Sequence, residues 1–539
     1  MHRKQQAHCE LGRHHCTLQV SRLRVFGRKQ LLNLARISHD SPIKGGGSED
    51  LSLSEQDLTV QRWSILWRTI ILSALGGTIY PYCKHLRMLD LRDLGYLLEE
   101  DKFRQGKIVK NFFSGPLERF NLTMEAPVRQ GSRNRPKKLD IRRIVVAVGD
   151  VMTEQSPLLE ALTEPTLNGL LSSALLSWAP RISHLRRLDL WDGSALADVT
   201  VCNLLHSHCP NLDALRIYSA TSQDADRHIA SFLNGRAPNT LTYFECLSDC
   251  HIGVETAMAL NTHGKSLTVL KLYLTEIKAL GCLQECTSVT TLAIDYSGQP
   301  DNLKETQNDL YLEIVEWLRA CVHLRDISLS HVISAPDLVL PLLLTKEIQL
   351  HKLQINSKEG MSYLVKDHHD FHQALGQELS LQELSLRADP EGLGRDDLET
   401  LTTSICFLSN LRHLTLTRIS DLFTDNDIQA VARNLENLEH IYVGGYGITD
   451  IVWDSVARLK SLKSLTFSGS TEFTKAGMLR FVEQLGDGNQ GLMLAIDNAA
   501  NESALTPEEQ DVVREALAAK VEGSLAYQLM RGMAHDSYT

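Results

Sequence analysis

The residues most able to do chemistry in this sequence are a Gly-Lys-Ser run, a histidine pair and several cysteines. Gly264, Lys265 and Ser266 resemble the end of a phosphate-binding loop, but that loop needs an earlier glycine where Ala259 stands. It also runs from strand to helix, whereas the apolar pattern here predicts a helix before Gly264 and a strand after it. We therefore expect Gly264 to end a helix and no nucleotide to bind.

The histidine pair is His368 and His372, one turn apart on a predicted helix, a spacing at which two imidazoles can hold a metal. Phe371 and Leu375 mark a buried stripe on that helix, and no further ligands are identifiable. We expect both histidines to flank the stripe in solvent. Because no Ser-His-Asp or Cys-His arrangement is recognisable either, we predict no metal site, no cofactor and no enzymatic activity.

Eleven cysteines are scattered through helical and strand-like patterns rather than forming a dense framework. This distribution favours reduced thiols in a cytoplasmic or nuclear protein over disulfides. Cys246, in "CLSDCH" (246–251), falls at an inward strand position and is expected in the core.

The elements that must position all these residues are set by a repeat. "HLRRLDLWD" (184–192) nearly copies "HLRMLDLRD" (85–93), and both fit the pattern L-x-x-L-x-L. From Leu185 onward eleven stretches fit it, one of them loosely, with first positions 22 to 35 residues apart. Between them apolar residues recur every three or four positions, which predicts helices. Self-similarity at this period predicts a solenoid in which successive repeats share one core.

This pattern resembles the leucine-rich repeat family, in particular its ribonuclease-inhibitor-like and cysteine-containing subclasses. The second subclass is marked by a cysteine shortly before the strand, as at Cys209, Cys286 and Cys321. The resemblance covers roughly residues 80–500. It implies an α/β leucine-rich-repeat solenoid, or horseshoe, with parallel strands on the concave face and helices on the convex face.

The repeat array is one of four regions that we predict along the chain. Leu86 to Leu91 gives an early repeat, 117–122 and 141–146 offer two more, and 491–499 is a degenerate last strand. The regions are 1–57, a basic tail with a Gly/Ser linker; 58–80, a helical cap; 81–500, the repeat array with a loop insertion at 126–140; and 501–539, a helix and tail.

Charge and hydropathy limit the partners. The chain carries a net charge of -11, which argues against nucleic-acid binding. Residues 1–36 hold eight Lys or Arg against one acid, so a targeting presequence is an alternative to a plain basic tail. The stretch at 69–83 is shorter than the ~20 apolar residues a membrane-spanning helix needs. We expect a cytoplasmic or nuclear protein that does not enter the membrane.

The predicted concave face carries two rows of outward-pointing residues in four consecutive repeats. The central row alternates in charge, and the next row is large and apolar: Asp189, Arg216, Glu245 and Lys271; Trp191, Tyr218, Leu247 and Tyr273. Aromatic groups beside arginine are typical of interface hot spots, so we predict that a protein partner docks here. The alternative is that the charges pair only with each other and the aromatics pack on their neighbours.

Cysteine-containing repeats also occur in F-box proteins, the substrate receptors of cullin-based ubiquitin ligases. Residues 58–72 resemble the final helices of an F-box, in which Trp63, Leu66, Trp67 and Ile70 would contact the Skp1 adaptor. The Leu-Pro opening of an F-box is missing from 1–57, so the box would be truncated or degenerate. The resemblance implies a substrate receptor of an SCF-type ubiquitin ligase. The alternative is a non-catalytic scaffold or regulator without a ubiquitin role, in which 58–80 only caps the array.

Overall fold

The computed structural model describes residues 48–104, 107–124, 138–165, 169–299, 301–358, 360 and 362–529, with side chains from residue 58 onward. The basic tail and most of the 126–140 loop therefore lie outside the described residues. The chain forms two compact units, Met1–His251 and Ile252–Thr539, which we call the N-terminal and C-terminal halves.

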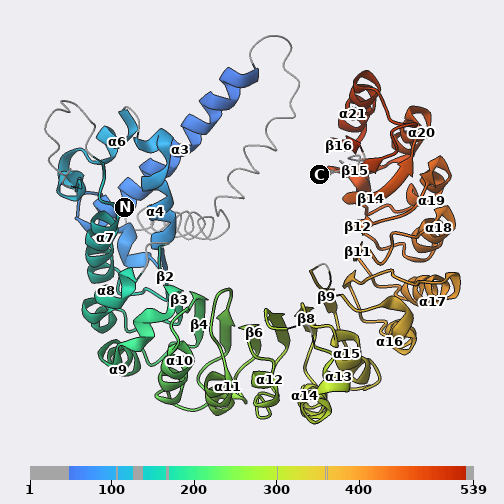
Figure 1. Cartoon of the computed structure of the whole chain (residues 1–539). Helices are drawn as coiled ribbons and strands as arrows, with labels where there is room; N and C mark the ends of the chain where they lie inside the picture. Colours follow the sequence, from blue (N-terminus) through green and yellow to red (C-terminus); the bar gives the residue numbers. More distant parts are fainter. Residues whose placement is uncertain are drawn as a thin grey trace, which may run out of the picture. The chain divides into compact units, whose positions relative to one another are not determined.

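The N-terminal half is a stack of parallel strands with helices on one side (Figure 1). Its strands, in spatial and sequence order, are β1 (Met88–Asp90), β2 (Ala161–Thr163), β3 (Arg187–Asp192), β4 (Ala214–Ser219) and β5 (Tyr243–Cys246). Its α-helices are α3 (Ser48–Ala74), α4 (Leu91–Glu99), α5 (Asp101–Arg104), α6 (Lys107–Phe112), α7 (Ile141–Gln155), α8 (Leu170–Trp178), α9 (Val199–His208) and α10 (Ala225–Asn234). Short 3-10 helices are η2 (Tyr82–His85), η3 (Gly115–Phe120), η4 (Ala179–Arg181) and η5 (Gly193–Ala197).

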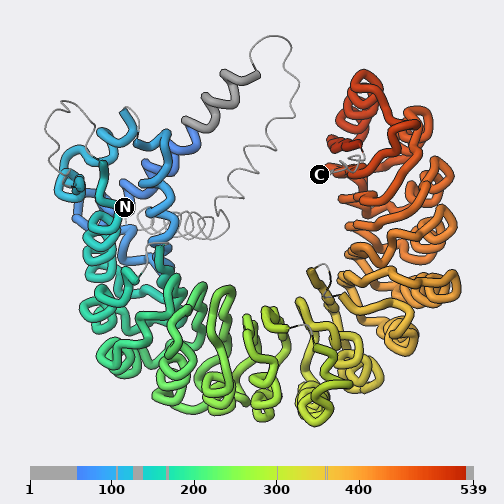
Figure 2. Tube along the Cα trace, in the orientation of Figure 1, coloured from blue at the N-terminus to red at the C-terminus, as the bar shows by residue number. Residues whose placement is uncertain are grey.

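The C-terminal half repeats the same arrangement, coil after coil (Figure 2). Its strands are β6 (Val269–Leu274), β7 (Thr291–Tyr296), β8 (Asp326–Ser330), β9 (Lys352–Asn356), β10 (Glu383–Arg387), β11 (His413–Thr417), β12 (His440–Val443), β13 (Ile448–Thr449), β14 (Ser464–Glu472), β15 (Met493–Ala499) and β16 (Ser524–Leu529). Its α-helices are α11 (Val254–Leu260), α12 (Lys278–Gly281), α13 (Leu303–Thr306), α14 (Asn308–Ala320), α15 (Ala335–Leu343), α16 (His369–Leu375), α17 (Arg395–Cys406), α18 (Asp425–Asn434), α19 (Trp453–Val456), α20 (Lys475–Gln484) and α21 (Pro507–Val521). Its 3-10 helices are η6 (Asn261–His263), η7 (Val365–Asp367), η8 (Asp450–Val452) and η9 (Asp487–Asn489).

The leucines of the repeat are buried between the strands and the helices. Leu188 and Leu190 of β3 are fully buried, and they align with Leu215 and Ile217 of β4, which are fully buried as well. A single coil cannot cover these side chains, so each coil depends on its neighbours for its core. The predicted α/β leucine-rich-repeat solenoid is confirmed in both halves.

The cysteines that precede the strands also stabilise the contact between successive coils. Cys209 and Cys321 are buried, and each thiol donates to a backbone carbonyl of the preceding coil, on Ile182 at 3.6 Å and on Cys286 at 3.5 Å. Burial raises the pKa of Cys286 and of Cys321 to about 12, so these thiols stay protonated and unreactive.

The early repeats differ from the sequence interpretation. Residues 117–122 contain a 3-10 helix and 141–146 lie in α7, so the two strands suggested there are wrong. Their aliphatic spacing of three serves a helix equally well. The missing repeat is β2, whose third aliphatic position is occupied by Glu164, which the pattern could not accept.

The two ends extend beyond the expected boundaries. Helix α3 begins at Ser48, before the boundary at 58, and packs against α4 to α7 as a cap. Helix α21, whose N-cap is Thr506, lies in the predicted C-terminal region, and a further strand, β16, follows it and pairs with β15. Of the described helices, none is both long and apolar enough to cross a membrane.

Candidate functional site

One row of side chains crosses the strand face of the N-terminal half, on the side away from the helices. The parallel register makes direct neighbours of Asp90, Thr163, Asp189, Arg216 and Glu245. Each stands next to a buried apolar residue, and alternation along the strand places it on the opposite face. The lateral charge alignment expected for Asp189, Arg216 and Glu245 is therefore present.

The acids of this row are covered rather than offered to solvent. Asp189 and Glu245 are each 3% exposed. Asp189 accepts hydrogen bonds from Thr163 Oγ1 at 3.2 Å and from Arg187 Nε at 2.8 Å. Glu245 accepts from Arg216 Nε and from the Tyr243 hydroxyl. Both acids were expected to face a partner; instead they lie beneath arginine and tyrosine side chains and are paired within the chain.

Above the acids lies a group of stacked cations and rings. We call it the arginine–aromatic cluster: Arg92, Arg187, Trp191, Arg216, Tyr218 and Tyr243. The Trp191 and Tyr218 rings are stacked, with centroids 5.2 Å apart and planes 24° apart. The Arg92 guanidinium lies 5.4 Å from the Tyr218 centroid, and its Nη1 donates to the Tyr218 hydroxyl at 2.8 Å. Planar cations over ring faces are attracted by the ring quadrupole, so the cluster holds itself together.

Tyr243 joins the remaining two arginines. The guanidinium carbons of Arg187 and Arg216 lie 5.6 Å and 5.7 Å from its ring centroid. Burial, together with the hydrogen bond to Glu245, raises the pKa of Tyr243 to about 12. The phenol is therefore a neutral donor at physiological pH, and the cluster keeps three positive charges above its paired acids.

Glu164 supports the cluster from inside the core. It is 1% exposed, and its carboxylate accepts hydrogen bonds from the N–H groups of Leu171, Trp191 and Asp192 at 2.8, 2.8 and 3.2 Å. Burial raises the pKa of Glu164, and these three donors oppose that rise. The contact fixes the end of β3, and with it the backbone of Trp191, to the start of α8.

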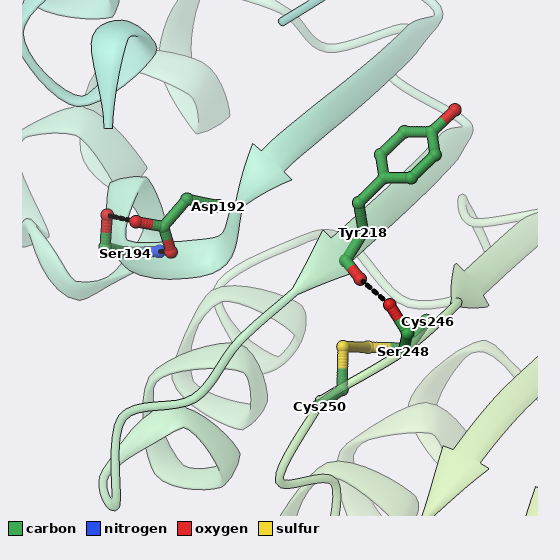
Figure 3. The surroundings of a disulfide bond; sticks show 6 residues. All are labelled: Asp192, Ser194, Tyr218, Cys246, Ser248 and Cys250. Carbon is green, nitrogen blue, oxygen red and sulfur yellow. Dashed lines mark hydrogen bonds between the residues drawn. A yellow bond between two sulfur atoms is a disulfide. The ribbon is translucent and has the colours of Figure 1, made fainter. Parts of the chain in front are cut away.

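A disulfide closes the loop beside Tyr218 (Figure 3). Cys246, at the end of β5, is bonded to Cys250, and both are buried. The Ser248 hydroxyl between them donates to the Tyr218 carbonyl oxygen at 3.0 Å. The core position predicted for Cys246 is confirmed. The expectation of reduced thiols is wrong for this pair. The two cysteines are only four residues apart, and the loop after β5 brings their sulfur atoms together.

The residues expected to contact an adaptor face the chain itself. The indole Nε1 groups of Trp63 and Trp67 both donate to Asp93 Oδ2, each at 2.8 Å. Trp67 and Ile70 are buried, and Leu66 is half-buried. These contacts join helix α3 to the first turn of α4.

Asp93 sits in an apolar setting beneath the cap. A small hollow beside it is lined by Trp67, Ile70, Leu86, Met88, Leu89 and Asp90. Burial raises the pKa of Asp93 from 3.8 to about 6, against the opposing effect of the two indole donors. The carboxyl therefore keeps its proton to a higher pH than an ordinary aspartate does.

The remaining expectations fall in the C-terminal half. Lys271 and Tyr273, the last members of the predicted rows, are half-buried on β6. Gly264 ends η6 and precedes β6, which excludes the strand–loop–helix order of a phosphate-binding loop. The backbone of Gly264 is not left-handed. Glycine is needed there because a side chain would collide with the Glu285 carbonyl oxygen.

The histidine pair differs from its prediction. His372 is 1% exposed and lies with its Nε2 3.4 Å from the Tyr363 hydroxyl, so it belongs to the core and not to a solvent-exposed flank. Burial lowers the pKa of His372 to about 3, which keeps the ring neutral. His368 precedes the helix as its N-cap residue.

The sequence carried one unused signal for the cluster. In the near-identical stretches 85–93 and 184–192, Arg92 of the first occupies the position of Trp191 in the second. The position that supplies a ring in one repeat therefore supplies a guanidinium in the other, and the fold brings the two positions to one face. Arg187 and Tyr243 were missed. Each stands two residues before a member of the central row, at a position where the residue type varies from repeat to repeat.

Comparisons with known proteins locate similar solved structures only. No family model and no curated protein matches the sequence. The crystal structure of the yeast Rad7 and Elc1 complex is 14% identical over 89% of this chain and 97% of that chain, with a TM-score of 0.41. An internalin from Listeria monocytogenes is 14% identical over 62% of this chain and 92% of that one, with a TM-score of 0.33. Neither similarity assigns a function to this chain.

Proposed function

We propose that this chain is a non-catalytic leucine-rich repeat protein that binds another protein through the arginine–aromatic cluster. The observation that carries the proposal is the layering of charge on the strand face. The side chains of Arg92, Arg187 and Arg216 are 26%, 28% and 22% exposed. Those of Asp189 and Glu245 are 4% exposed. A partner would meet cations and rings first.

The chemistry of the cluster fits an acidic segment of the partner. A guanidinium has five N–H donors in a fixed fork, and carboxylates match that geometry. Stacking on the rings and pairing with the acids below already orient the three arginines. Binding would therefore cost little side-chain entropy, which is the condition under which aromatic and arginine residues become hot spots.

A photo-crosslinking experiment tests the position of the interface. Leu247 is 37% exposed, follows β5 and adjoins Tyr218 through the N–H of Ser248. Benzoylphenylalanine at 247 should crosslink a partner from a cell lysate. The same residue at Val199, which is 69% exposed on α9, is the matched control on the helix side.

The proposal predicts a product specific to position 247. Arg92→Gln should reduce that product, and the variant should remain folded because the Asp90 side chain beneath Arg92 is 23% exposed and can be solvated. Identical products at 247 and 199, or a product indifferent to Arg92→Gln and to salt, would contradict the assignment.

A narrower role, as substrate receptor of an SCF-type ubiquitin ligase, has one supporting observation. Leu58 and Ile65 are 45% and 54% exposed on α3 and stand two turns apart, so they lie on one side of the helix. An adaptor would use this side of α3 and not the tryptophans, because Trp63 and Trp67 already donate hydrogen bonds to Asp93 within the chain.

Co-purification separates the receptor from a scaffold without a ubiquitin role. A receptor should recover Skp1 and cullin, and Leu58→Asp with Ile65→Asp should abolish the recovery while leaving crosslinking at 247 intact. If the wild-type chain recovers neither protein under gentle conditions, the receptor role is excluded and a scaffold without a ubiquitin role remains.

A further inference from the structure

Two histidines and a glutamate converge on the strand face of the C-terminal half, outside every site discussed above. His413 begins β11 and His440 begins β12, and the parallel register makes them direct neighbours. Leu414 and Ile441, which follow them, are buried, so the imidazoles point to the opposite face. Their ring centroids are 4.5 Å apart.

Glu439 completes the group. One ligand atom from each of His413, Glu439 and His440 lies within 4.8 Å of the others, and all three side chains are half-buried. From the geometry we infer that these residues form a binding site for a divalent transition-metal ion, with zinc as the natural probe. Imidazole and carboxylate ligands suit zinc, copper and nickel, whereas magnesium and calcium prefer oxygen ligands alone.

The distances allow coordination with small side-chain movements. Ligand atoms around a tetrahedral zinc at ~2.0–2.1 Å are about 3.4 Å apart. Each pair of ligand atoms at 4.8 Å or less therefore has to close by at most about 1.4 Å, which side-chain rotation can supply. Three protein ligands leave a further position for water or for a side chain of a partner.

The backbone that carries the ligands is already fixed. The N–H groups of Glu439 and His440 both donate to the Arg412 carbonyl oxygen, at 2.8 and 3.0 Å. The His413 N–H donates to the Gln382 carbonyl oxygen at 3.0 Å. The ligands thus lie on two paired strands or directly before one of them, and they cannot separate without breaking the ladder, which is the preorganisation a metal site requires.

The neighbouring charges are balanced around the site. Arg412 Nη1 donates to Glu439 Oε1 at 3.0 Å, an outer contact that can orient the carboxylate while its second oxygen binds the ion. Glu383, aligned with His413 on β10, pairs with Lys352 at 2.7 Å. Because Glu383 is paired with Lys352 and Glu439 with Arg412, we expect moderate rather than tight zinc binding.

Histidine footprinting on the full chain tests the site residue by residue. Carbethoxylation is mapped by mass spectrometry at pH 7.5 with increasing zinc. Residue-level mapping is needed because the chain has 21 histidines, several of which could bind zinc elsewhere. Zinc should protect His413 and His440 together, and should leave the exposed His323 reactive. Magnesium at the same concentrations should protect neither.

Matched variants decide whether the three residues act as one site. His440→Gln and Glu439→Gln should each move the zinc midpoint for His413 protection at least about tenfold higher. His323→Gln should leave it unchanged, and protection in each variant is measured relative to its own metal-free reactivity, because the His440 ring lies 4.5 Å from that of His413. Unprotected histidines at millimolar zinc, equal protection by magnesium, or a midpoint indifferent to Glu439→Gln would overturn the assignment.

Discussion

The docking of the N-terminal cap should depend on the ionisation of Asp93. In the folded chain the pKa of Asp93 is raised from 3.8 to about 6. A carboxyl whose pKa is raised by folding stabilises the fold while it is protonated, and this contribution is lost as the pH rises through about 6. A shift of about two pKa units corresponds to a cost of roughly 3 kcal/mol for holding the charged form in place.

Asp93→Asn should remove that cost, because an amide oxygen can still accept from Trp63 and Trp67 but carries no charge. At pH 7.5 we expect the cap to gain on the order of 1–3 kcal/mol, the lower value allowing for lost charge-assisted hydrogen bonds and helix-dipole interaction. At pH 5, about one unit below its folded pKa, wild-type Asp93 is already mostly protonated, and the gain should shrink by about 1.4 kcal/mol.

Hydrogen exchange of α3 amides, followed by mass spectrometry, measures this locally. A change of 1.4 kcal/mol is a tenfold change in protection. Wild-type α3 should lose about tenfold protection between pH 5 and 7.5 after correction for intrinsic rates, and Asp93→Asn should not. Asp101→Asn, at an exposed aspartate in the same half, controls for net charge. If Asp93→Asn weakens protection at pH 7.5 or preserves the pH dependence, the account of Asp93 is refuted.

Three further perturbations probe the rest of the chain. Because the pKa of His372 is lowered to about 3, its stabilising contribution is present above pH 6.5 and declines below it. Acidification to pH 5 should cost helix α16 about 2 kcal/mol by hydrogen exchange, and an equal loss in His372→Gln would contradict this. Glu164→Ala removes the acceptor of three N–H groups and should cost roughly 2–4 kcal/mol in urea unfolding, with Glu164→Gln milder. Cys250→Ser should cost about 2 kcal/mol or less and speed amide exchange at Ser248 without affecting α9; unchanged exchange at Ser248 would show that the disulfide does not hold the loop.

The repeating aliphatics made the solenoid predictable, because each repeat buries the same positions. The pattern failed where one core position carried a polar residue with its own hydrogen-bond partners. Glu164, directly after β2, occupies the place of a leucine, and its three N–H donors come from β3 and the start of α8, which no local pattern records. Strand β16 was missed for a similar reason: Glu522, at the first position of its repeat, is the left-handed C-cap of α21.

The candidate site was predictable only in part. The alternation of charge along Asp189, Arg216 and Glu245 follows from register, and the sequence contains it. The burial of each charged group cannot be predicted from the sequence, because it depends on which long side chain folds over which short one. Arg187, two residues before Asp189 on the same strand, covers that acid, and Tyr243 covers Glu245 in the same way. Exposure was therefore assigned to the acids when it belongs to the arginines.

The first turn of α4 links the cap to the proposed interface. Asp90 is its N-cap and accepts from the N–H groups of Arg92 and Asp93, at 3.0 and 3.2 Å. Asp93 then holds the indoles of the cap, while the neighbouring Arg92 lies over Tyr218. Because both side chains leave the same turn, a movement of α4 that follows release of the cap also moves the Arg92 guanidinium relative to its ring. A protein that bound helix α3 and displaced it would therefore move Arg92 through this turn. A protein bound to the helices of the other repeats would not act through α4.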